Sequence, residues 1–191
     1  MIVNKRITSK QQGFTLIELL FALGIAAILL NIGLPSFQTL LENSKMTAEI
    51  NQLRGTLQLA RESAITQNKK VTICPSEDGL TCSTNWSDGY ISFIDDNSDR
   101  KNNGSDELIV QYKNTDSDLI LRWRAFGVKS SFQWHQTGIT NYQNGTFEYC
   151  NQKNPELARA LFISKSGNIR VSKDTNGDGI HENTSGKNIS C

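Results

Sequence analysis

The side chains best suited to chemistry lie in an acidic loop near the end of the chain. Residues 174–179 read DTNGDG, which places Asp174, Asn176 and Asp178 at alternate positions. Oxygen ligands at this spacing, followed by a glycine at the sixth position, suit a hard cation such as Ca²⁺. The twelfth position is Ser185 instead of a bidentate glutamate, although Glu182 could supply a carboxylate. Two interpretations stay open: a calcium site, or a turn built from Asx side chains.

The two histidines of the chain do not belong to a catalytic pattern. Neither His135 nor His181 has a nearby cysteine or serine in a nucleophile motif, and the sequence holds no HExxH and no glycine-rich phosphate loop after a strand. We interpret both histidines as surface or turn residues. The sequence therefore predicts that the chain is not an enzyme and, calcium apart, has no cofactor.

Two groups of basic residues have the chemistry to contact the phosphates of DNA. The first, in the final segment of the chain, consists of Lys165, Arg170, Lys173 and Lys187. The second combines cations with aromatic rings, as in proteins that bind single strands, and consists of Arg122, Trp123, Arg124, Lys129 and Trp134. The net charge of +1 gives no overall basic signature. For both groups the alternative is an ordinary exposed strand, with Trp123 facing the core.

An apolar run near the N-terminus, residues 14–34, contains a single ionisable residue, Glu18. A helix rises about 1.5 Å per residue, so about 20 residues cross a bilayer core of about 30 Å. Lys5, Arg6 and Lys10 precede the run without an acidic residue among them, which favours a cytosolic N-terminus. We therefore predict a single membrane span over residues 14–35, with the rest of the chain outside the cytosol.

Four cysteines follow the apolar run, at Cys74, Cys82, Cys150 and Cys191. An even number in an exported domain predicts two disulfides, and the sequence alone allows three pairings. We favour Cys74 with Cys82, which closes a short loop, and Cys150 with Cys191, which tethers the last residue. The competing idea is a zinc site, but the chain has no CxxC and both histidines lie away from the cysteines.

The remaining pattern predicts one long helix followed by antiparallel strands. Apolar residues at spacings of three and four predict that an amphipathic helix continues to about Gln67, with Pro35 bending it. This stripe consists of Met46, Ile50, Leu53, Leu57, Ala60 and Ala64. β-branched and aromatic content predicts strands at residues 70–74, 89–94, 107–113, 119–126, 132–136, 146–150, 158–164 and 168–173, and Asn-Gly pairs at 103–104, 144–145 and 176–177 predict turns. The expected fold class is α+β: a long N-terminal helix, transmembrane in its first half, packed on an antiparallel β-rich C-terminal domain.

The start of the apolar run carries a family resemblance. Residues 13–18 read GFTLIE, which closely resembles the type IV prepilin and pseudopilin signature. Further along, the segments LQLARESAITQNKKVTICPSEDG, WSDGYISFIDD and ARALFISKSGNIRVSKD resemble the GspH/FimT group of minor pilins and pseudopilins. The resemblance covers most of the chain, although residues 114–147 match only loosely. It implies a pilin-like form of the α+β fold.

The resemblance also implies a route of processing and assembly. A prepilin peptidase would cut after Gly13, and the new N-terminal Phe14 would be N-methylated. Residues 1–13 would then be a cytosolic leader, residues 14–35 the transmembrane half of the helix, and residues 36–191 a periplasmic or extracellular domain. A carboxylate within hydrocarbon costs at least about 2.5 kcal/mol, so Glu18 needs a partner or a function. The resemblance implies that it pairs with the Phe14 amine of a neighbouring subunit; the alternative is a glutamate that reaches back to the cytosolic interface of a plain signal anchor.

Three roles follow from this resemblance. The first is a minor pilin that initiates a type IV pilus or lies near its tip, with other pilin subunits as partners and a single-pass location in the inner membrane before assembly. The second is the same subunit acting as a DNA receptor in natural transformation. FimT-type members carry Gly-Arg-x-Arg in their basic C-terminal region, whereas this chain has Gly167-Asn-Ile-Arg170 and lacks one arginine. The alternative is a minor pseudopilin of a type II secretion system.

Overall fold

A computed structural model describes residues 13–191, except residues 103 and 105. The described residues form two compact units that divide between Leu41 and Glu42. Residues 1–12 of the predicted leader, including its basic residues, lie outside the described residues, as does Asn103 of one predicted turn. The two units are described separately.

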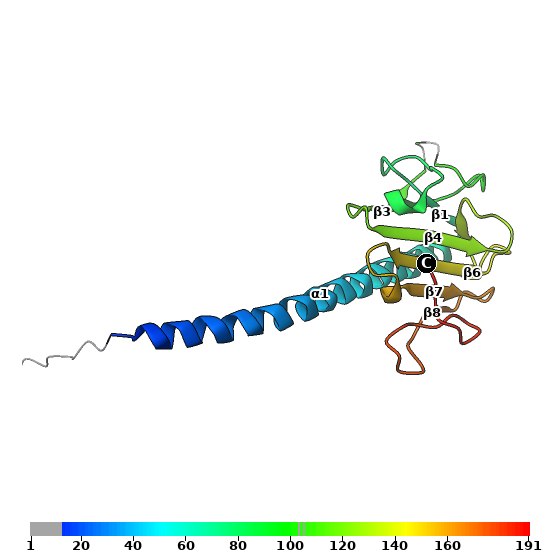
Figure 1. Ribbon diagram of the computed structural model, residues 1–191. Coiled ribbons are helices and arrows are strands. Elements are labelled where there is room, and N and C mark those ends of the chain that lie inside the picture. The colour runs from blue at the N-terminus through cyan, green and yellow to red at the C-terminus, as the bar shows by residue number, and fades with distance from the viewer. Residues whose placement is uncertain (1–12, 103, 105) are drawn as a thin grey trace, which may run out of the picture. The chain divides into compact units, whose positions relative to one another are not determined.

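Helix α1, Leu16–Gln67, begins in the first unit and ends in the second (Figure 1). It continues through Pro35, as predicted, and ends at the predicted residue. In the first unit its large apolar side chains are exposed; Leu16, Phe21 and Leu29, for example, are 79%, 68% and 65% exposed. By hydropathy, no helix among the described residues is long and apolar enough to cross a membrane. The span over residues 14–35 stays a prediction.

In the second unit, α1 buries the predicted apolar stripe. All six stripe residues are at most 2% exposed, so this prediction is confirmed. The helix ends where Asn68 takes a left-handed conformation, with φ of 53°. The N–H of Asn68 donates to the carbonyl of Ile65 and the N–H of Lys69 to that of Ala64. These two hydrogen bonds form a Schellman motif, which satisfies the last carbonyls of the helix.

Two antiparallel four-stranded sheets complete the second unit. The first sheet has the order β3-β2-β1-β5 and consists of β1 (Val71–Pro75), β2 (Gly89–Ile94), β3 (Leu108–Lys113) and β5 (Phe132–Trp134). The second has the order β4-β6-β7-β8 and consists of β4 (Leu119–Ala125), β6 (Gly145–Asn151), β7 (Arg159–Ile163) and β8 (Ile169–Val171). Short 3-10 helices cover Trp86–Asp88 and Pro155–Leu157. Each predicted strand is present with its ends shifted by at most two residues, and the predicted α+β fold is confirmed.

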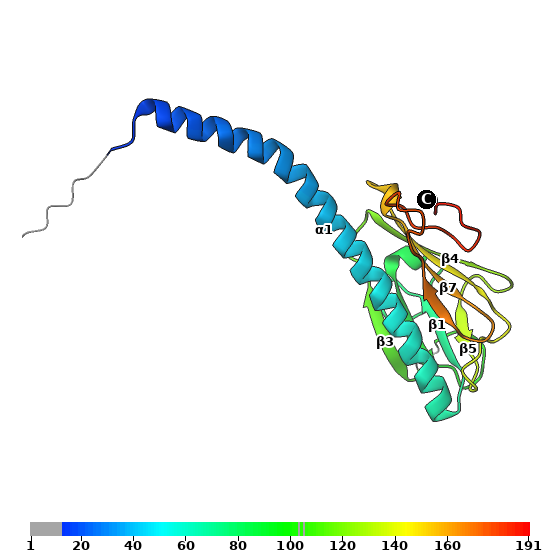
Figure 2. The same ribbon diagram turned by 90° about the horizontal axis from the view of Figure 1, so that it is seen from below.

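The core lies where α1 and the two sheets meet. Figure 2 shows the part of α1 in the second unit lying against the strands, and the six stripe residues belong to one apolar cluster with side chains from both sheets. Aromatic rings fill much of this cluster. Phe147 stacks on Trp123 with ring centroids 4.2 Å apart and meets Trp86 edge to face at 5.0 Å. Aromatic pairs in these geometries contribute about 0.5–1.5 kcal/mol beyond the area they bury.

Two disulfides close loops in the second unit. They join Cys74 to Cys82 and Cys150 to Cys191, with Cα atoms 5.6 and 5.7 Å apart. These are the two pairings that we favoured from the sequence. The first lies beside Ile91 and Phe93 of β2, and the second fixes the last residue of the chain to β6.

The predicted turn at residues 144–145 is wrong, because Gly145 is the first residue of β6. A Cβ atom at this position would lie 2.3 Å from the carbonyl oxygen of Arg124 and 2.7 Å from the ring of Trp123. The glycine is therefore required by close packing against β4 and not by a left-handed turn. Gly177, in the pair at 176–177, does have a positive φ of 80°.

Candidate functional site

The first candidate site is the start of α1, where Thr15 and Glu18 bind each other. The N–H of Glu18 donates to the Thr15 hydroxyl at 3.3 Å, while the Thr15 N–H and hydroxyl both donate to the Glu18 carboxylate at 2.9 Å. This arrangement is a capping box, which satisfies two free N–H groups at a helix start. The sequence analysis missed the role of Thr15, although the spacing Thr-x-x-Glu ahead of an apolar run is the usual signal.

The capping box lies immediately beside the predicted processing junction. Phe14 follows the predicted cleavage position and is 90% exposed. The Glu18 carboxylate is thus already held by its own chain, close to where cleavage after Gly13 would create an amine. The structure brings Gly13, Phe14 and Glu18 into one short segment, as their sequence positions require.

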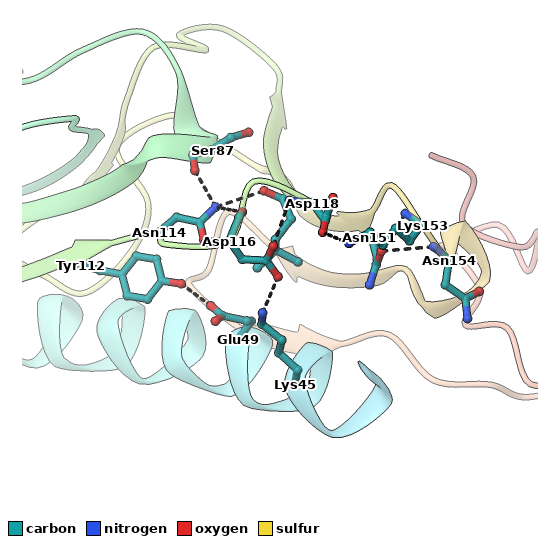
Figure 3. A network of polar contacts seen from close by, with 11 residues as sticks. Lys45, Glu49, Ser87, Tyr112, Asn114, Asp116, Asp118, Asn151, Lys153 and Asn154 are labelled. Carbon is teal, nitrogen blue, oxygen red and sulfur yellow. Dashed lines mark hydrogen bonds and ion pairs between the residues drawn. The ribbon is translucent and has the colours of Figure 1, made fainter. Parts of the chain in front are cut away.

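A second site holds the first turns of α1 in the second unit against the loop between β3 and β4 (Figure 3). Lys45 forms an ion pair with Asp116, and the Tyr112 hydroxyl donates to the Glu49 carboxylate. The hydrogen bond from Lys45 is the main reason that the pKa of Asp116 lies below its ordinary value. Burial, and next the bond to Glu49, raise the pKa of Tyr112, so the phenol stays protonated and donates.

The loop itself is fixed by Asn114, whose amide nitrogen donates to the carbonyls of Ser87, Asp116 and Leu119 at 2.8–3.1 Å. Asp118, in the same loop, pairs with Lys153 from the loop after β6. Figure 3 shows these contacts running from α1 across the loop to Lys153. The network therefore fixes the position of α1 along its own axis against the end of both sheets.

Arg61 also attaches α1 to loops of the second unit, near the C-terminal end of the helix. Its guanidinium donates to the carbonyl of Gly138 at 2.7 Å and to that of Gly167 at 3.0 Å, and lies 5.5 Å from the centre of the Trp134 ring. Both glycines have positive φ values, and a Cβ on Gly167 would lie 2.5 Å from the Gly138 carbonyl oxygen. Arg61 thus joins two loops to the helix. The sequence analysis assigned no role to Arg61.

The first basic group does not act as a single cluster. Arg170 and Lys173 line a cavity of about 720 Å³, which also includes Arg54 from α1. Lys165 lines a different cavity of about 470 Å³, beside the exposed rings of Phe126 and Tyr142. Lys187 is exposed in the C-terminal loop. The sequence analysis did not include Arg54, because it lies more than a hundred positions before the others.

The second basic group does not present aromatic rings to a ligand. Trp123 and Trp134 are 6% and 0% exposed, so the alternative that places Trp123 in the core is confirmed. Arg122 donates to the carbonyl of Cys191 at 3.3 Å, and Arg124 forms an ion pair with Glu148 at 2.8 Å. Stacking of bases on these two tryptophans, as single-strand binders use, is therefore ruled out.

In the acidic loop, the carboxylates of Asp174, Asp178 and Glu182 have oxygens within 4.8 Å of one another. The amide of Asn176, which belongs to the predicted metal set, donates to the Asp178 carboxylate at 3.0 Å and accepts the N–H of Asp178 at 2.9 Å. Glu182, which the sequence analysis named as a possible further carboxylate, therefore lies with Asp174 and Asp178 in a group that could hold a cation. Each carboxylate also accepts hydrogen bonds from the protein: Glu182 from the N–H of Thr175 at 2.8 Å, and Asp174 from that of Gly177 at 2.7 Å. The arrangement serves a calcium site and an Asx turn equally well.

The two histidines lie in polar surroundings outside any catalytic arrangement of the described residues. His135 bonds the Thr137 hydroxyl at 2.9 Å, and His181 bonds the Ser172 hydroxyl at 2.9 Å. Burial is the main cause that lowers the pKa of His181, with the neighbouring Arg159 cation second. His181 is therefore neutral at pH 7 and serves as a local hydrogen-bonding group.

Comparison with solved structures identifies similar folds. The type IV minor pilin FimU of Pseudomonas aeruginosa superposes with a TM-score of 0.55 at 19% identity, covering 69% of this chain and 91% of FimU. The minor pseudopilin EpsH of the Vibrio cholerae type II secretion system gives a TM-score of 0.49 at 10% identity, covering 65% and 94%. Both identities are low, so similarity of this kind bears on the fold alone. Only the FimU superposition, with its TM-score above 0.5, supports the fold.

Comparison of sequences identifies the family. The fimbrial protein EcpB of Eikenella corrodens is 37% identical over 71 residues, which is 37% of this chain and 44% of EcpB, so the chain spans less than half of this curated relative. A prokaryotic N-terminal methylation motif matches residues 8–30. The family model for the type II transport protein GspH matches residues 49–167, more than half of the chain. The chain therefore belongs to the GspH family, whose members are structural minor pilins and pseudopilins and not enzymes.

Proposed function

We propose that the chain is a minor pilin of a type IV pilus, incorporated through its N-terminal helix at the initiation or tip complex. One observation carries this proposal: in the first unit, α1 leaves its large apolar side chains exposed, with Leu20, Ile25 and Leu30 all 57–58% exposed. An exposed apolar surface of this kind needs a partner. Lipid would cover it before assembly, in a single inner-membrane span with the domain in the periplasm, and neighbouring pilin helices would cover it afterwards.

The capping box gives Glu18 a role in both states. Before processing, its carboxylate accepts from the N–H and hydroxyl of Thr15. Cleavage after Gly13 by a prepilin peptidase, followed by methylation of Phe14, would supply cationic amines on neighbouring subunits. The Thr15 donors are neutral, whereas an ammonium adds the attraction between opposite charges to the hydrogen bond. We infer that the Phe14 amine of a neighbour takes over the Glu18 carboxylate and so sets the register of assembly.

The alternative function is a minor pseudopilin of a type II secretion system. The GspH description of the matching family supports it, whereas the fimbrial relative supports the pilus. Both functions use the same helix and the same Glu18. Deletion of the gene separates them: loss of surface pili identifies the first, and secreted proteins that accumulate in the periplasm identify the second.

DNA binding and calcium binding are narrower proposals for the C-terminal segment. The support for DNA binding is that Arg170 and Lys173 line one cavity together with Arg54, so three cations could contact phosphates; a peptide bound in the same cavity would exclude DNA. For calcium, the cluster of Asp174, Asp178 and Glu182 is the support. A rise in melting temperature with added Ca²⁺ that Glu182→Gln abolishes would identify a cation site, and an unchanged melting temperature would identify an Asx turn.

The decisive experiment for assembly replaces Glu18 with alanine in the full chain. We expect leader cleavage to survive, while the subunit disappears from sheared filaments on immunoblots. Glu62→Ala is the matched control, because Glu62 is an exposed glutamate on the same helix within the second unit. Normal incorporation of the Glu18→Ala subunit would refute the register argument.

A further inference from the structure

The cavity lined by Arg170 and Lys173 runs along the free edge of a sheet. Strand β8 is the last strand of the second sheet, which leaves its outer side without a neighbouring strand in the part of the chain that the structure describes. We call this cavity of about 720 Å³ the β8 groove. Its lining residues come from β8, from the C-terminal loop at Thr184 and Gly186, and from α1 at Arg54. In Figure 1 the C-terminal loops lie next to β8.

The register of β8 shows which backbone groups face the groove. The N–H of Ser172 donates to the carbonyl of Ala160 in β7, and the N–H of Ser164 donates to that of Asn168. Hydrogen-bonded pairs alternate with non-hydrogen-bonded pairs in an antiparallel ladder. Ile169 and Val171, which lie between these bonded pairs in the register, are therefore the non-hydrogen-bonded residues. Their N–H and carbonyl groups point away from β7, into the β8 groove.

The charge of the groove is positive. Arg54, Arg170 and Lys173 are all exposed, and none of the three forms a hydrogen bond or ion pair through its side chain with another described residue. Glu182 also lines the groove, but it is only 5% exposed and its carboxylate accepts the N–H groups of Thr175 and Asn176. The three cations thus outnumber the one carboxylate that lines the groove, and none of them forms an ion pair with it.

We propose that the β8 groove binds an extended acidic segment of a partner protein, which adds to the second sheet as a strand beside β8. An extended peptide offers N–H and carbonyl groups in alternation, which match the alternating groups of Ile169 and Val171. Carboxylates on that peptide complement Arg54, Arg170 and Lys173. A β-strand edge used in this way obtains affinity from the backbone and specificity from the side chains on either side.

The same groups favour a peptide over a nucleic acid. Phosphate oxygens only accept hydrogen bonds, so they would be repelled by the carbonyl oxygens of Ile169 and Val171 that face the groove. A peptide satisfies these carbonyls with its own N–H groups. The inference goes beyond the proposed role in assembly, because it concerns a surface of the second unit that neither Phe14 nor Glu18 contributes to.

The test measures fluorescence anisotropy with the purified full chain in detergent micelles. The probe is a labelled seven-residue peptide of alternating valine and glutamate, at low ionic strength. We expect Arg170→Glu to weaken binding at least tenfold, a loss of about 1.4 kcal/mol. Lys129→Glu, which reverses an exposed charge outside the groove, should change the affinity less than twofold.

Two further probes separate strand addition from simple charge attraction. The same peptide with N-methyl groups on alternate residues keeps its charge but cannot pair with an edge, so it should not bind. Twelve-residue oligothymidine should not displace the unmodified peptide. Absence of peptide binding, equal binding of the N-methylated peptide, or full displacement by oligothymidine would each overturn the proposal. Because the assay does not require assembly, its failure would leave the Glu18 prediction intact.

Discussion

Replacement of Arg61 by methionine tests how the end of α1 is joined to the sheets. Methionine keeps the apolar stem over Trp134 but removes the donors that bond Gly138 and Gly167. A hydrogen bond from a charged group contributes about 1.5–3 kcal/mol, and the cation over the ring about 0.5–1 kcal/mol. These contributions share one side chain and are not additive, so we expect a loss of about 2–4 kcal/mol in the free energy of unfolding.

The assay is urea unfolding of residues 42–191, which contain both disulfides and every core residue that is buried in the described part of the chain. The midpoint should fall without a change in slope, since the amount of surface exposed on unfolding stays the same. Hydrogen exchange should accelerate most in the loops at Gly138 and Gly167. Arg54→Met is the matched control: this arginine lies two turns earlier on the same helix and should change stability by less than about 0.5 kcal/mol. An Arg61→Met domain within that same margin of wild type would refute the reasoning.

Two further perturbations test other contacts of the second unit. The pKa of Asp116 is lowered in the folded state by Lys45, so its contribution to stability is present above its unfolded pKa of about 3.9 and is lost as pH falls through the folded value. Asp116→Asn should therefore reduce the decline of stability in acid, measured as urea midpoints from about pH 5 downwards. The control, Glu156→Gln, should leave that decline unchanged. An unchanged pH profile in Asp116→Asn would contradict the role assigned to the Lys45–Asp116 pair. Cys191→Ser should release the C-terminal loop. The amide of Ile189, which donates to the carbonyl of His181, should then exchange faster than in the wild type, while the amides of α1 exchange at an unchanged rate. Equal protection of Ile189 in both proteins would show that the disulfide does not hold the loop.

Local pattern predicted the elements of the second unit well. The stripe from Met46 to Ala64 repeats with the period of a helix, and each strand carries enough β-branched and aromatic side chains to be recognised. Gly145 was misinterpreted because an Asn-Gly pair normally indicates a turn, while the actual constraint is the ring of Trp123 on a neighbouring strand. That constraint arises only after β4 and β6 pair, so the residues next to Gly145 in the sequence do not indicate it.

The candidate sites were predicted less completely, for a similar reason. The cysteines follow from their spacing along the chain, and the favoured pairings are confirmed. The assembly role of Glu18 stays a prediction. Arg61 contacts loops 77 and 106 residues away, so nothing near it in sequence indicates its role. Arg54 joins Arg170 only through the packing of α1 beside β8. Glu182, by contrast, is close in sequence to Asp174, and its carboxylate lies with those of Asp174 and Asp178 in the acidic cluster.

The two attachments of α1, at Lys45 and at Arg61, have a mechanical consequence. They are 16 positions apart, which corresponds to about 24 Å along a helix, and both join the helix to loops that are held by the sheets. A force applied along the helix axis loads both attachments, and the apolar contacts between them, in shear. Shear requires these contacts to break together, whereas peeling would break them one after another. A subunit pulled by its N-terminal helix would therefore resist extraction of that helix far better than the strength of either attachment alone suggests.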